Sequence, residues 1–129
     1  EADIKNFVRK ARAGADIAIT QLFFNNADYF DFVERARRMG ATLPIIPGIM
    51  PILSIQQIEK IARLCGARIP NDLRLELKKH ESDPDGVREI GIQHAIRQCR
   101  ELKARGVPGI HFYTLNKSYS TRKVVQALA

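Results

Sequence analysis

Three short apolar runs divide this sequence, and a glycine lies shortly before each of them. The runs cover residues 16–21, 44–48 and 109–114. Their apolar residues follow one another without regular polar alternation, which is typical of parallel strands that are covered on both faces. Longer amphipathic stretches separate the runs, as crossover helices do in βαβ units. The pattern predicts an α/β fold in which three parallel strands lie side by side in chain order.

The stretches between the runs carry signals for helix ends. Asp28 is the expected N-cap of the helix after the first run, and Ser54 is the expected N-cap after the second. A longer helix is expected to begin after Asp83-Pro84 and to end at Gly106, because proline suits a first turn and glycine a C-terminal end.

This order of elements does not make a closed architecture by itself. Three strands in one sheet would leave two unpaired edges, and the sequence offers no evident device that protects them. The same order is what the last three β/α units of an eight-stranded barrel would show. The chain also opens on a helix and lacks an initiator Met. We therefore expect residues 1–129 to be a single segment, the C-terminal part of a (β/α)8 TIM barrel whose N-terminal part is absent.

Composition and charge exclude several classes of function. The 21 Lys and Arg residues exceed the 14 Asp and Glu residues by seven, but they are spread along the chain. This favours a solvated basic surface over an anion site, and it argues against a nucleic-acid binder. The longest uncharged run, residues 41–58, contains three prolines and predicts no membrane span. No secretory signal or metal motif is visible, and the two cysteines are expected to be reduced thiols in a cytoplasmic protein.

The first helix has two distinct faces when each residue turns by about 100°. Its apolar face, which should pack on the sheet, consists of Ile4, Phe7, Val8 and Ala11. Its polar flank consists of Asp3, Asn6 and Lys10, with Arg9 just beyond. The flank suits a solvated helix side, and it equally suits a nucleotide, because Asp accepts from ribose hydroxyls while Asn, Arg and Lys donate to pyrophosphate. The residues alone leave both interpretations open.

Three longer motifs occur in order along the chain. They are GADIAITQLFF at residues 14–24, PIIPGIMPI at residues 44–52 and HFYTLN at residues 111–116. Together they resemble the methylenetetrahydrofolate reductases, flavoproteins of one-carbon metabolism and methionine biosynthesis. The resemblance covers essentially the whole chain and corresponds to the C-terminal two-fifths of the family's catalytic barrel. It implies an oxidoreductase that reduces methylenetetrahydrofolate to methyltetrahydrofolate with NADH or NADPH through FAD.

The resemblance also implies roles for individual residues. The positions that would hold the ribose and pyrophosphate of FAD are Asp3, Asn6, Arg9 and Lys10. The positions that would contact the folate are Gln21, Gln57 and Lys117. Gln21 is the last residue of the first run, immediately after residues 17–20, and its amide can both donate to and accept from a pterin edge. Lys117 stands where bacterial members carry Arg, and Ile61 stands where they carry an aromatic residue. The catalytic residues of the family would lie outside this segment, which we expect to be inactive alone.

The full enzyme implied by the resemblance is a cytoplasmic homo-oligomer that binds neither nucleic acid nor a membrane and holds no metal. Two alternatives to a part of an enzyme remain at this point. One is a non-catalytic barrel fragment that folds by dimerising through its open edges. The other is a small anion-binding α/β module without redox function. His111 is interpreted as a core histidine, because it stands inside an apolar run.

Overall fold

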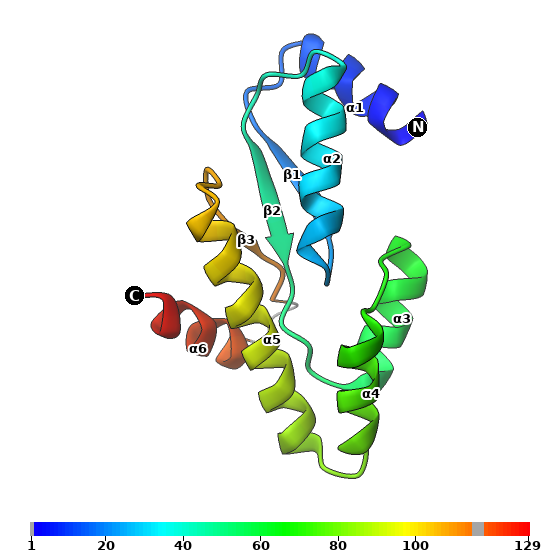
Figure 1. Ribbon diagram of the computed structural model, residues 1–129, viewed down its shortest axis with the longest axis vertical. Helices are drawn as coiled ribbons and strands as arrows, with labels where there is room; N and C mark the ends of the chain where they lie inside the picture. The colour runs from blue at the N-terminus through cyan, green and yellow to red at the C-terminus, as the bar shows by residue number, and fades with distance from the viewer. Residues whose placement is uncertain (1, 115–117) are drawn as a thin grey trace.

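The computed structural model describes residues 2–114 and 118–129. Within these residues helices and strands alternate much as the sequence predicts (Figure 1). The elements in chain order are α1 (Ala2–Arg12), β1 (Ala18–Leu22), α2 (Asn26–Arg38), β2 (Ile45–Ile49), α3 (Ile55–Cys65), α4 (Asn71–Lys79), α5 (Pro84–Ala104), β3 (His111–Phe112) and α6 (Tyr119–Leu128).

The three strands form one parallel sheet in the order β1-β2-β3, which confirms the predicted pairing and chain order. Ala18 of β1 lies opposite Ile45 of β2, and Gly48 of β2 lies opposite His111 of β3. β3 is much shorter than the predicted run of residues 109–114. Of these residues, only His111 and Phe112 are paired with residues of β2, so the rest of the predicted run is not part of the strand.

Polar side chains define the starts of two helices. The Oγ atom of Ser54 accepts a hydrogen bond from the backbone N–H of Gln57 at 3.0 Å, which confirms the predicted cap of α3. The predicted cap of α2 is wrong. Asn25 is the N-cap, and its Oδ1 atom accepts from the N–H of Ala27 at 3.0 Å. Asp28 lies in the first turn instead, where a negative charge stabilises the positive end of the helix dipole.

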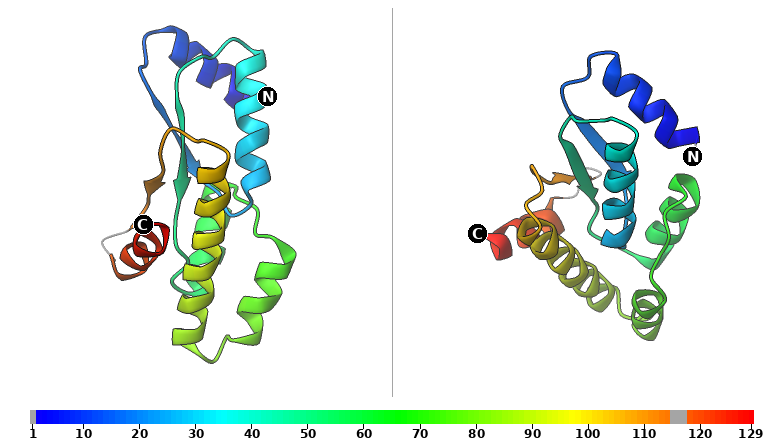
Figure 2. Two further views of the ribbon diagram at one scale, coloured as in Figure 1. Left: turned by 60° about the vertical axis from the view of Figure 1, so that its left-hand side comes forward. Right: turned by 45° about the horizontal axis from the view of Figure 1, so that its top comes forward.

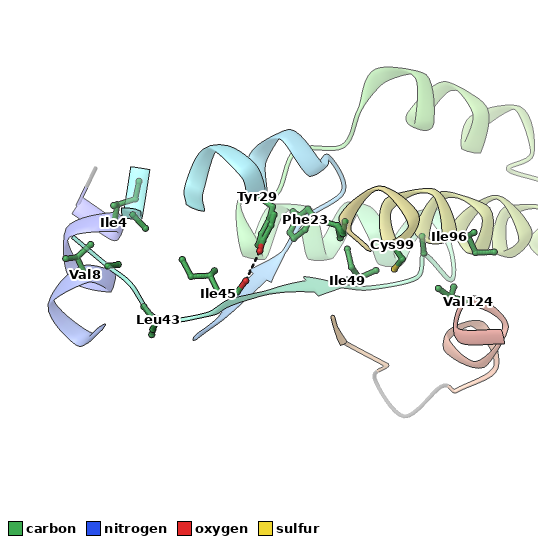
Figure 3. Packing of buried hydrophobic residues seen from close by; sticks show 14 of the residues in the cluster. Ile4, Val8, Phe23, Tyr29, Leu43, Ile45, Ile49, Ile96, Cys99 and Val124 are labelled. Carbon is green, nitrogen blue, oxygen red and sulfur yellow. Dashed lines mark hydrogen bonds between the residues drawn. The ribbon is translucent and has the colours of Figure 1, made fainter. Parts of the chain in front are cut away.

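The larger hydrophobic cluster lies between the sheet and α2 and α5, with contributions from α1 and α6 (Figure 3). Ile45 and Ile49 of β2 point into it, and each is at most 1% exposed. The hydroxyl of Tyr29 crosses this layer and donates to the carbonyl of Ile45 at 2.7 Å (Figure 3). Cys99 of α5 is fully buried here as a free thiol, and burial raises its pKa to about 12.

The predicted apolar face of α1 is confirmed within this cluster. Ile4 and Val8 are buried, and Ala11 packs against them from the same helix face. The ring of Phe7 meets that of Phe32 of α2 edge to face, with centroids 5.1 Å apart. These contacts fix the orientation of α1 and therefore the direction in which its polar flank points.

A second hydrophobic cluster lies at the carboxyl ends of β1 and β2, beyond which α3 and α4 extend (Figure 1). Leu22 and Phe24 enter it from the end of β1, and Met50 and Ile52 enter it from the end of β2. They pack against buried residues of α3, α4 and the first half of α5. This cluster holds α3 next to the edge of the sheet at which functional residues of α/β folds collect.

Helices α2 and α5 lie on the same face of the sheet, and the opposite face of β1 is left open (Figure 2). Ile19 in β1 is 47% exposed, and Ile17 just before the strand is 54% exposed. Parallel sheets are normally covered on both faces, so an open face with exposed isoleucines is unusual for a self-contained parallel fold. One-sided helix cover and parallel strands in chain order are consistent with part of an α/β barrel.

Candidate functional site

The carboxyl end of β1 contains an irregularity that involves Gln21. Ile19 is paired with Ile46 and Leu22 with Gly48, so Thr20 and Gln21 together lie opposite the single residue Pro47. This is the two-against-one arrangement of a β-bulge, which is uncommon between parallel strands. Proline has no amide hydrogen for the ladder and is found within sheets at edges or at bulges. Pro47, in the central strand, explains why β1 needs an extra residue at this point.

Side chains replace the missing ladder hydrogen bonds at the bulge. The N–H of Gly48 donates to the Oγ1 atom of Thr20 at 3.0 Å. The hydroxyl of Tyr113, which follows β3, donates to the carbonyl oxygen of Thr20 at 2.9 Å. The backbone N–H of Tyr113 donates to the carbonyl of Ile49 at 2.9 Å. Thr20, Gly48 and Tyr113 thus connect all three strands directly beside Gln21.

Gln21 lines a cavity of about 780 Å³ that runs along the free edge of β1. Residues of α1, of α2 and of the turn after α3 form its other walls, and Lys10 of α1 is among them. The side chain of Gln21 is exposed, and within the described part of the chain nothing hydrogen-bonds to its amide. Two of the residues that sequence reasoning assigned to a ligand site, Gln21 and Lys10, therefore share one cavity.

The same cavity contains an ion pair between Arg68, in the loop after α3, and Asp28 in the first turn of α2. The hydrogen bond and the charge of Asp28 both raise the pKa of Arg68, so its guanidinium stays cationic. The ion pair joins the loop after α3 to α2 across one wall of the cavity. Lys10, Arg68 and Asp28 thus give the cavity two cationic groups and one carboxylate.

The remaining polar residues of α1 are not all directed into this cavity. Arg9 lines a separate groove of about 430 Å³ together with Lys5 and Arg12. Arg9 is turned about 100° from Lys10 around the helix axis. Lys5 and Arg12, four residues before and three residues after Arg9, lie on the same side of the helix as Arg9. Asn6 is exposed on the helix surface. The predicted nucleotide-binding set is thus divided between two surfaces of the helix.

Two further predicted site residues are Asp3, in α1, and Lys117. The side chain of Asp3 and the whole of Lys117 lie outside the described part of the chain.

Gln57 has a local structural role. Its Oε1 atom accepts a hydrogen bond from the N–H of Leu53 at 2.8 Å, and its Nε2 atom lies 4.0 Å from the sulfur of Met50. The side chain therefore helps to cap the start of α3, and it does not line the cavity that contains Gln21. The S-x-x-Q spacing of Ser54 and Gln57 is that of a capping box, a sequence signal that indicates this role.

His111 is half-buried, and its ring packs edge-on against that of Tyr113, with centroids 4.6 Å apart. It lies opposite Gly48 of β2. Because His111 is only half-buried and its ring contact is made within one segment of the chain, its interpretation as a core histidine stays a prediction.

Sequence reasoning missed a polar network that joins α5 to the loop after β1. The Nε2 atom of Gln98 donates to the carbonyl of Phe23 and to the Oδ1 atom of Asn26, each at 3.2 Å. The Nδ2 atom of Asn26 donates to Glu101 at 2.7 Å and to the Gln98 carbonyl at 3.1 Å. The i, i+4, i+7 spacing of His94, Gln98 and Glu101 along one face of α5 was the available signal.

His94 belongs to the same helix face, one turn before Gln98. Its Nε2 atom lies 2.8 Å from the carbonyl oxygen of Phe24, which fits a neutral ring protonated at Nε2. Burial lowers the pKa of His94, the carbonyl contact opposes this shift, and the charge of nearby Arg97 adds to it. His94 and Gln98 together hold two consecutive carbonyl groups of the loop that follows Gln21.

In the described part of the chain, no helix is both long and apolar enough to cross a membrane.

Comparison with known proteins gives one consistent result. The sequence profile of the family described as methylenetetrahydrofolate reductase matches residues 1–129. The "Probable methylenetetrahydrofolate reductase (NADPH)" of Caenorhabditis elegans is 40% identical over 99% of this chain and 20% of its own length. The "Methylenetetrahydrofolate reductase (NADH) 1" of Arabidopsis thaliana is 33% identical over 99% of this chain and 22% of its own length.

A bacterial relative matches over a larger share of its own length. The "5,10-methylenetetrahydrofolate reductase" of Salmonella typhimurium is 34% identical over 99% of this chain and 43% of its own length. The chain therefore spans about a fifth of these eukaryotic relatives and about two-fifths of this bacterial one.

Proposed function

Because this chain belongs to the methylenetetrahydrofolate reductase family, we propose that it forms part of an enzyme that reduces methylenetetrahydrofolate to methyltetrahydrofolate. The observation that carries the proposal is the cavity along β1, which brings Gln21 and Lys10 together. In this proposal residues 1–129 are the last three β/α units of a (β/α)8 barrel of the bacterial type. The earlier units come from sequence that the chain does not contain.

The exposed surfaces of the sheet support the barrel. β1 is an edge strand, and its free edge borders the cavity. A preceding parallel strand would pair along that edge, and the remaining strands would enclose the open face that carries Ile19. The carboxyl ends of the strands, where Gln21 lies, would then face the common active site of the barrel.

The donor groups on α1 are of the kind that binds one end of a dinucleotide cofactor. Lys10 offers a cation in the cavity, whereas Arg9 lines the separate groove and Asn6 is exposed on the helix surface. We propose that these residues, with Asp3, bind the ribose and pyrophosphate of FAD. A bound flavin would supply the hydride-transfer chemistry, with NADH or NADPH, both of which occur in the names of the relatives, as reductant.

Gln21 is proposed to orient the folate. Its amide both donates and accepts, which matches the donor–acceptor edge of a pterin, and it lines the cavity. Gln57 and Lys117 are proposed as further folate contacts. The Oε1 atom of Gln57 is already engaged with Leu53, so only its Nε2 atom would be free to donate to a ligand. Since the catalytic residues of the family would lie in the earlier units, the isolated chain is proposed to be inactive.

The substitution Gln21→Glu in a complete reductase that carries this segment tests the proposal. It keeps the size of the side chain but replaces the amide donor with an acceptor. One hydrogen bond to the folate is lost and an unpaired group remains, which costs about 1–3 kcal/mol, or roughly ten- to a hundred-fold in binding or rate. The reduction of folate should fall by this factor while flavin content stays normal.

Stopped-flow measurement of both half-reactions distinguishes the outcomes. Gln126→Glu makes the same chemical change at an exposed position of α6 and is the matched control. Unchanged folate kinetics in Gln21→Glu would remove this residue from the site. Loss of flavin from the variant would make the role of Gln21 structural.

A further inference from the structure

We infer that Tyr113 and Thr20 are positioning residues that hold the bulge of β1 and thereby direct Gln21 into the cavity. The inference rests on the proposed function of Gln21. It concerns residues other than the proposed folate and flavin contacts, and it follows from how the three strands are joined at one point.

The direction of the Gln21 side chain is linked to the residue that precedes it in β1. Side chains along β1 alternate without interruption, so Gln21 is exposed on the same side as Ile19, while Leu22 enters the second hydrophobic cluster. The bulge places Thr20 and Gln21 together opposite Pro47, and the peptide that joins Thr20 to Gln21 takes its orientation from the contacts that hold Thr20. The direction of the Gln21 amide therefore depends on how Thr20 is held.

Backbone hydrogen bonds between β1 and β2 do not hold the bulge by themselves. Pro47 has no amide hydrogen to donate opposite Thr20 and Gln21. Two side-chain oxygens provide the missing interactions, the Oγ1 atom of Thr20 as acceptor from Gly48 and the hydroxyl of Tyr113 as donor to the Thr20 carbonyl. Both contacts are made by the residue that immediately precedes Gln21.

The ring of Tyr113 packs closely over Gly48 of β2. Its ring passes so close to Gly48 that a Cβ atom on this glycine would lie 2.6 Å from the Cε2 atom of Tyr113 and 2.7 Å from the carbonyl oxygen of Thr20. Both distances are too short for a real contact. Glycine at position 48 thus allows the side chain of Tyr113, the residue after β3, to reach across β2 to β1.

The test is a double-mutant cycle on the folate half-reaction of a complete reductase that carries this segment. Tyr113→Phe removes only the hydroxyl, and a lost hydrogen bond of this kind corresponds to roughly a three- to tenfold effect. We expect KM for folate to rise by this factor while kcat for flavin reduction by the nicotinamide nucleotide and flavin content stay unchanged. In a Gln21→Ala background the same substitution should have no further effect, because it acts through Gln21.

The outcomes separate the two proposals. If Gln21→Ala leaves folate kinetics unchanged, the proposed function fails. If Gln21→Ala impairs folate reduction but Tyr113→Phe has the same effect in both backgrounds, only the positioning role fails. Should Tyr113→Phe reduce the yield of folded enzyme, Thr20→Val takes its place in the cycle, because it keeps the side-chain shape and removes the acceptor for Gly48. An additive result with Thr20→Val overturns the inference as well.

Discussion

At the scale of single residues, the proposed function depends on Gln21 at the carboxyl end of β1. Gln21 was predicted to lie at this end because functional residues follow strands in α/β folds, and the structure places it there. The bulge of β1 was not predictable from the run of apolar residues. It depends on which residue of β2 lies opposite, and Pro47 acquires its effect only through that pairing.

For Gln57, in contrast, the structure shows a role in capping α3, whereas the resemblance implied a folate contact. A sequence signal for its structural role was present in the spacing from Ser54, yet the resemblance drew attention to a ligand role. A glutamine whose Oε1 atom already accepts from a backbone N–H has its Nε2 donor and one Oε1 lone pair left for a ligand. Local hydrogen bonding should therefore be considered before a role is carried over from a family.

His94 provides a prediction on pH dependence. Its pKa is lowered in the folded chain from the ordinary value of 6.5, chiefly by burial, with Arg97 lowering it further and Asp72 and Glu76 opposing. The unfolded chain therefore binds more protons as the pH falls below about 6.5, and the free energy of unfolding contributed by His94 is lost toward acid pH. We expect stability to fall between pH 7 and pH 5, and to fall less in His94→Gln.

Urea unfolding of both chains at several pH values measures this difference. His80→Gln is the matched control, because His80 is exposed at the end of α4. Equal pH dependence of the original chain and His94→Gln would show that folding does not lower the pKa of His94.

At the scale of elements, the order and direction of the strands followed from the sequence, whereas the joints between elements did not. Continuous apolar runs separated by helical stretches were sufficient to predict the parallel sheet. The network of Asn26 and Gln98 was missed, because two polar residues far apart in sequence satisfy each other only once α5 packs on the loop after β1. Periodicity indicates which face of a helix is buried, but it does not identify the partner of a buried amide.

The contact between α5 and the loop after β2 gives a prediction at this scale. A Cβ atom on Gly91 would lie 2.3 Å from the carbonyl oxygen of Ile52 and 2.8 Å from its Cβ atom. Gly91→Ala should therefore force α5 away from the loop and destabilise the chain by about 1–3 kcal/mol, as overpacking does.

Denaturant unfolding monitored by circular dichroism measures the effect of Gly91→Ala. The control is Gly109→Ala, since a Cβ atom there meets nothing within 4 Å. Equal stability of the two variants would mean that α5 and the loop do not pack as closely as described.

At the scale of the whole molecule, the open face and the free edge of β1 connect the fold to the proposed function. The sequence predicted an incomplete barrel from the order of its elements, and the sheet has the parallel strands and one-sided helix cover that such a part requires. Only one side of the proposed flavin site is present, because Lys10 and Gln21 face a cavity bordered by an unpaired strand edge. A few charge-assisted contacts cannot offset the cost of ordering a dinucleotide without the opposite wall.

The most direct test of this account is therefore FAD affinity, measured by flavin fluorescence on the purified 129-residue chain and on a complete reductase that carries it. The complete protein should retain its flavin, and the isolated chain should show no submicromolar binding, because the other half of the site is missing. Circular dichroism on the same sample of isolated chain verifies that it is folded. Submicromolar affinity of the folded chain for FAD would contradict the claim that these residues form only one part of the site.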